Sequence, residues 1–198
     1  MNFNRLYRDR LGDALAIITE ILSLHVQEEY KRTVEIPQEW NALVASGDIR
    51  LFEARQGSAI LQCCSISSGN TSFPGFAKAA KKMDLVIQRS PAGHTNIITQ
   101  QLRSLDLRPV IAGLRQAERA ALGMPSLPHS STATGTADDV PVWYYDDAAN
   151  TIQNGGIDPQ GLPATKLPLD TIIQSVKANL QKGVIGSLKR DKEAGTQR

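Results

Sequence analysis

The sequence predicts an α+β fold, with a mostly antiparallel sheet of four to six short strands and helices packed on one face of it. Segments with apolar residues at every third or fourth position, typical of helices, occur between short segments of alternating apolar and polar residues, typical of strands. The strand-like segments come in pairs around short turns, which predicts antiparallel hairpins. Apolar residues make up 41% of the 198 residues, enough to bury a core.

The first predicted element is a long helix from residue 10 to about residue 31. Positions at three- and four-residue steps form a stripe along this helix: Leu11, Leu15, Ile18, Leu22 and His25. Three further apolar residues widen the stripe: Ile17, Leu24 and Val26. This stripe is wider than a surface helix needs, so we expect the helix to pack on two sides. Either a homodimer or a partner protein covers it, or residues 140–198 fold back over it.

A second helix is expected to begin at Pro37, whose missing N–H has no partner in a first helical turn, and to end near Gly47. A hairpin follows, with strands over residues 49–55 and 58–65. Cys63 and Cys64 alternate to opposite faces of the second strand, so at least one thiol is expected to be buried and inert. Two adjacent cysteines form neither a disulfide framework nor a four-ligand zinc site.

The middle of the chain predicts a short basic helix (FAKAAKK), then strands over residues 84–90 and 94–100 that meet at the turn Pro91-Ala92-Gly93. A further helix follows, with Asp106 as its N-cap and Gly123 at its end.

The chain is expected to have a main α+β body over residues 1–123. Residues 124–139 are rich in Pro, Ser, Thr and Gly and contain no Lys or Arg, which predicts a flexible linker. Residues 140–198 are expected to form a small β-hairpin and a helix, between Pro168 and Gly183, that dock on the body.

Several function classes lack their motifs. The sequence has no GxxxxGK[ST] loop, GxGxxG, GxSxG or HExxH, and its three histidines and two cysteines show no metal-ligand spacing. We therefore expect no cofactor and no metal, and the sequence leaves open whether the chain is an enzyme. No run approaches the roughly 18 apolar residues that cross a bilayer, so we expect no membrane contact and a cytoplasmic location.

The candidate ligand site lies at the turn between the two middle strands. Residues 76–119 carry eight basic and three acidic residues, whereas both flanking regions are net negative. A guanidinium, a hydroxyl, an imidazole and an amide at one turn suit a phosphate-containing ligand: Arg89, Ser90, His94 and Asn96. Two further residues complete the predicted set: Arg103, from the same basic segment, and Lys166, just before a predicted helix start where phosphate could bind. The alternative is that the turn is polar only because turns are exposed.

The run DLVIQRSPAGHTNIITQ, followed by LDLRPVIAGLRQAE, resembles the accessory, substrate-binding domain of the DHH phosphoesterase superfamily. The resemblance covers residues 10–122, but the Asp-His-His triplet and the GGGGH segment of that superfamily are absent. It implies a nucleotide- or nucleic-acid-binding module that acts beside a separate catalytic chain. The tail resembles segments of short bacterial proteins, which implies a bacterial or phage source.

Two other functions stay open. The chain could be a protein-interaction or inhibitor protein that binds a partner through its first helix, for which the broad apolar stripe is the best argument. It could also be an unrecognised hydrolase that oligomerisation completes.

Overall fold

The computed structural model describes residues 3–100, 105–126, 131–155 and 161–183. The predicted site residue Arg103 lies outside these ranges. The chain forms two compact units, Met1–Ala42 and Leu43–Arg198. The divisions expected at residues 123 and 139 both fall inside the second unit.

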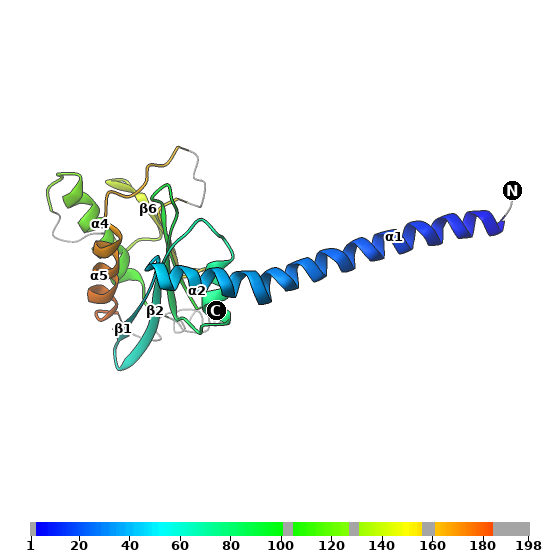
Figure 1. Cartoon of the computed structure of the whole chain (residues 1–198). Helices are drawn as coiled ribbons and strands as arrows, with labels where there is room; N and C mark the ends of the chain where they lie inside the picture. Colours follow the sequence, from blue (N-terminus) through cyan, green and yellow to red (C-terminus); the bar gives the residue numbers. More distant parts are fainter. Residues whose placement is uncertain (1–2, 101–104, 127–130, 156–160, 184–198) are drawn as a thin grey trace, which may run out of the picture. The chain divides into compact units, whose positions relative to one another are not determined.

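The first unit is helical and contains α1 (Phe3–Tyr30), the π-helix η1 (Lys31–Glu35) and most of α2 (Ile36–Ser46) (Figure 1). The sequence predicts a break between residues 31 and 37, but the chain stays helical there. Pro37 cannot donate a hydrogen bond, and its ring crowds the preceding turn. The wider π turn accommodates this, since the Ile36 N–H donates to the carbonyl oxygen of Lys31, five residues back.

The second unit combines strands and helices, and the predicted hairpins and helices are confirmed to within a few residues. Its elements are β1 (Ile49–Gln56), β2 (Ala59–Ser67), α3 (Phe73–Ala79), β3 (Leu85–Arg89), β4 (Thr95–Thr99), α4 (Arg108–Ala121), β5 (Gly135–Ala137), β6 (Val140–Asp146), β7 (Thr151–Gln153) and α5 (Leu169–Leu180).

Among the described residues, seven strands form one mixed sheet in the order β1-β2-β3-β4-β7-β6-β5. The α+β class is therefore confirmed, although the sheet has more strands than the four to six expected. The short strand β5 lies inside the segment expected to be a linker. β2 and β3 are parallel, because a crossover through α3 connects them, and the other neighbours are antiparallel.

The main core lies between the sheet and two helices, α4 and α5, which pack against each other (Figure 1). Sheet residues such as Cys63, Leu85 and Ile97 point into it. The expectation that all helices share one face is wrong for α3. α3 packs on β3, where Val86 and Gln88 alternate away from the core, and the Gln88 amide donates to the carbonyl of Asn70, just before α3.

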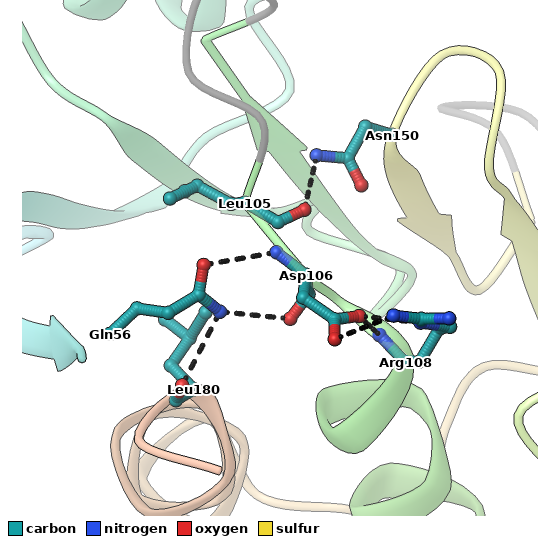
Figure 2. A network of polar contacts seen from close by, with 6 residues as sticks. All are labelled: Gln56, Leu105, Asp106, Arg108, Asn150 and Leu180. Atoms are coloured by element: carbon teal, nitrogen blue, oxygen red, sulfur yellow. Dashed lines mark hydrogen bonds and ion pairs between the residues drawn. The ribbon is translucent and has the colours of Figure 1, made fainter. Parts of the chain in front are cut away.

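A buried amide ties β1 to both ends of the helical layer (Figure 2). Gln56 Nε2 donates to the carbonyl oxygens of Asp106 (3.1 Å) and Leu180 (3.3 Å), and Gln56 Oε1 accepts from the Asp106 N–H at 3.0 Å. Asp106, the expected N-cap of α4, lies one residue before the actual N-cap, Leu107. Its carboxylate instead accepts from the Arg108 N–H (3.1 Å) and pairs with the Arg108 guanidinium (2.8 Å). Together these bonds fix the start of α4 and the end of α5.

Candidate functional site

The first candidate site is the turn between β3 and β4, where the sequence places a phosphate-binding cluster. The Ser90 N–H donates to the His94 carbonyl (2.8 Å) and the Gly93 N–H donates to the Ser90 carbonyl (2.9 Å). Gly93 has a φ of +89°, a conformation that glycine adopts without strain. The hairpin thus brings Arg89, Ser90 and His94 to one end of the sheet, as predicted.

The polar side chains at this end are bonded to the protein itself. Arg89 Nη1 donates to the carbonyl of Leu167 (2.9 Å), and His94, which is buried, places Nδ1 3.1 Å from the carbonyl of Asn154. Because a carbonyl oxygen can only accept, His94 carries its proton on Nδ1. The Asn96 amide, oriented so that it satisfies its bonds, donates to the Gly155 carbonyl at 2.7 Å.

The two remaining predicted residues differ in their surroundings. Ser90 Oγ is buried and has no hydrogen-bond partner among the described residues. Lys166 is exposed, and its backbone N–H donates to Glu118 Oε1 at 2.8 Å. Lys166 follows the Ala164–Thr165 stretch that approaches the turn, where Ala164 lies next to Gly93.

At least four of the eight basic residues of the 76–119 segment form hydrogen bonds or ion pairs within the fold. Arg89 and Arg108 are bonded within the fold although they are not fully buried, and two further arginines of α4 are buried. Arg115 donates to the carbonyls of Ser131, Ala133, Gly135 and Trp143, and Arg119 pairs with Asp139 at 2.5 Å and donates to the Pro125 carbonyl. Burial lowers the pKa of the Arg115 guanidinium, and the charge of Asp139 opposes that shift. The net charge of this segment therefore overstates the basic surface that a polyanion could meet.

Glu118 is a buried acceptor that the sequence analysis did not single out. Its carboxylate accepts from Trp143 Nε1 (3.0 Å), from the Thr165 hydroxyl and from the Lys166 N–H. The spacing to Ile111 and Leu114 places Glu118 on the apolar face of α4, a signal that could have revealed its burial. Its contacts hold the loop before α5 against α4.

The second candidate site is the apolar side of α1. Eight large aliphatic side chains there are each 52–65% exposed: Leu11, Leu15, Ile17, Ile18, Ile21, Leu22, Leu24 and Val26. We call this set the apolar arc. At 3.6 residues per turn it spans roughly 200° of the helix circumference, against about 100° for an ordinary amphipathic helix.

In the part of the chain that the structure describes, no group of three or more His, Cys, Asp or Glu side chains could hold a metal ion. The described helices include none that is both long and apolar enough to cross a membrane. Burial raises the pKa of the Cys63 and Cys64 thiols to about 12, so neither is a ready nucleophile.

Comparison with protein-family models, curated proteins and solved structures gives no match. The resemblance to the DHH accessory domain therefore stays a prediction.

Proposed function

We propose that this chain is a self-assembling protein in which α1 binds the α1 helices of other copies. The exposed apolar arc is the observation that carries the proposal. Burying one aliphatic side chain stabilises a structure by roughly 1.5–3 kcal/mol, so eight of them on one helix strongly favour association. Soluble monomers rarely leave such a contiguous apolar patch in water.

The polar side of α1 supports a protein partner over a lipid surface. Over residues 10–30 it carries Asp13, Glu20 and Gln27, with Thr19 and Ser23 on the same side. Helices that lie on membranes instead carry Lys and Arg on this side, which bind anionic lipids. The acidic and neutral polar side of residues 10–30 fits the water-facing exterior of a helical bundle.

Phosphate binding at the β3–β4 turn has less support from the geometry. Arg89, His94 and Asn96 donate to backbone carbonyls, so a ligand would have to replace bonds that the fold already makes. Nucleotide or nucleic-acid binding stays a prediction.

Sedimentation equilibrium of the intact chain tests self-assembly. We expect a mass that is a multiple of the 21.5 kDa of one chain. The double variant Leu15→Asp with Leu22→Asp should sediment as a monomer, because carboxylates do not enter an apolar interface without a large cost. The matched control, Ser23→Asp with Gln27→Asp, adds the same charge to the polar side and should stay assembled.

Near-ultraviolet circular dichroism would confirm that the second unit remains folded in each variant, since Trp143 is fully buried there. An intact chain that sediments as a monomer at every accessible concentration would overturn the proposal. Such a result, together with binding to lipid vesicles, would favour the membrane-surface alternative.

A further inference from the structure

Seven of the eight residues of the apolar arc of α1, all except Val26, fall in two rows, each with the three- and four-residue steps of a coiled-coil seam. The central row contains Leu11, Leu15, Ile18 and Leu22. The flanking row contains Ala14, Ile17, Ile21 and Leu24, with Arg10 and Glu28 at its two ends. Every member of the two rows lies inside the single helix α1.

The angle between the two rows indicates how many helices meet. Each position of the flanking row lies one residue before a position of the central row, so the rows point about 100° apart. In a two-stranded coiled coil, only one row faces the partner. In a square of four helices, each helix faces two neighbours at a right angle, which matches the two rows of α1.

The buried area gives the same answer. At about 25 cal/mol per Å², full burial of an aliphatic side chain corresponds to roughly 60–120 Å². The four residues of the central row then supply roughly 240–480 Å², which is below the about 800 Å² per partner of a stable interface. The seven large aliphatic residues of the two rows together supply roughly 420–840 Å². One row alone is therefore too small for a stable interface, and only burial of both rows reaches the required area.

Residue types in the central row also favour more than two helices. Leu15 and Leu22 occupy equivalent a positions, Ile18 occupies the d position between them, and Leu11 occupies the preceding d position. Leu at a with Ile at d shifts coiled coils from dimers towards trimers and tetramers.

Charge complementarity sets the direction of the helices along the flanking row. If two copies of this row run antiparallel, Arg10 of one copy meets Glu28 of the other at both ends. The same register places Ile17 opposite Ile21 and Ala14 opposite Leu24, so a large residue faces a small one. A parallel pair would place Arg10 beside Arg10 and Glu28 beside Glu28, which repel. The antiparallel contact is self-complementary, as a two-fold interface requires.

From these observations we propose that four copies of this chain assemble through a bundle of four α1 helices, with neighbours antiparallel across the flanking row. This inference rests on the self-assembly proposed above and adds the partner, the number of copies and the direction. The occupant of each row is α1 of another copy of this chain.

Sedimentation equilibrium of the intact chain distinguishes this inference from self-assembly alone. We expect four times the mass of one chain. A stable dimer or trimer would overturn the four-helix bundle and leave self-assembly standing, whereas a monomer would overturn both. Ile17→Asp, in the flanking row only, should break the tetramer into species of lower mass, and it should do nothing if only the central row is buried.

Directed cross-linking tests the orientation in the intact protein. Chains with Ala14→Cys and chains with Leu24→Cys, mixed and oxidised with copper phenanthroline, should form a disulfide between the two kinds of chain. Ala14→Cys alone should not cross-link, because antiparallel neighbours separate two copies of residue 14 by ten residues, about 15 Å, beyond the reach of a disulfide. The native thiols are buried and should not interfere. Efficient cross-linking of Ala14→Cys with itself would overturn the antiparallel arrangement.

Charge reversal gives a second measurement that does not depend on cysteine. Arg10→Glu and Glu28→Arg should each raise the dissociation constant of the assembly several-fold, and the double variant should recover wild-type assembly. The matched control Asp13→Lys lies on the polar side and should have little effect. Single variants that assemble like the wild type, or a double variant weaker than both, would contradict the predicted Arg10–Glu28 contact.

Discussion

Helices α1 and α4 differ in which side chains they expose to water and which they bury. α1 leaves its aliphatic side chains in water, whereas α4 buries three charged ones, Arg115, Glu118 and Arg119, each at most 5% exposed. The charged side chains of α4 are buried because carbonyls and polar hydrogens of the following 125–166 region surround them. The comparison teaches that helical periodicity shows which residues share a face, while the neighbouring groups decide whether that face meets water.

The largest loss of stability is expected on substituting Glu118, the buried carboxylate of α4. Glu118→Gln replaces one acceptor oxygen with an NH2 group that would face the donors of Trp143, Thr165 or Lys166. We expect it to lower the free energy of unfolding by about 2–4 kcal/mol, measured by urea denaturation. The matched change on α1, Glu20→Gln, removes an exposed charge and should shift stability by less than about 0.5 kcal/mol. Equal losses of stability in the two variants would contradict the prediction that the buried glutamate of α4 matters more than the exposed glutamate of α1.

Alanine substitutions of one glycine in each helix compare α4 and α1 again, with smaller expected changes in stability. A Cβ at Gly113 of α4 would collide with the Asn179 side chain of α5, which is held by Ser175. Gly113→Ala should therefore destabilise the second unit by about 1–2 kcal/mol. A Cβ at Gly12 of α1 meets nothing within 4 Å, so Gly12→Ala should stabilise the helix by about 0.5–1 kcal/mol. Thermal melts followed by circular dichroism measure both, and a stabilising Gly113→Ala would contradict the close α4–α5 packing.

The buried thiols of β2 predict that the stability of the second unit decreases at alkaline pH, an effect smaller than those of the substitutions above. Burial raises the pKa of Cys63 and Cys64 to about 12, whereas thiols in the unfolded chain ionise near pH 9. Above that pH the unfolded state loses thiol protons that the folded state keeps, so the free energy of unfolding should fall between about pH 9 and pH 12. Urea titrations should show a shallower fall for the double variant Cys63→Ala with Cys64→Ala. Parallel curves for the two proteins would indicate that the thiols titrate alike in both states.

The smallest effect is expected in the test of phosphate binding. Titration with a single-stranded oligonucleotide should show at most weak binding that disappears as salt rises, because four arginines of the middle segment are bonded within the fold. A tight complex that resists salt and is lost on Arg89→Gln, but not on the exposed control Arg55→Gln, would instead establish the turn as the ligand site.

The sequence predicted local structure well, because periodicity and turn residues act over short distances. The β3–β4 hairpin and the wide stripe of α1 were both visible in it. Strand β5 was missed, since Gly135–Ala137 is too short to show an alternating pattern. The partners of Arg89 and His94 are backbone carbonyls 78 and 60 residues further along the chain. No local pattern encodes such contacts, so the sequence could place these side chains together but could not show that the fold itself bonds them.

The Gln56 amide also bears on the order in which the chain folds during synthesis. It joins β1 to the carbonyl of Leu180, 124 residues later, so the second unit cannot complete this contact until residue 180 has left the ribosome. Helix α1 needs only contacts within one or two turns and is synthesised before the second unit, so it can form earlier. Neighbouring nascent chains on one messenger RNA would therefore present finished α1 helices beside unfinished second units, which favours assembly between chains of the same transcript.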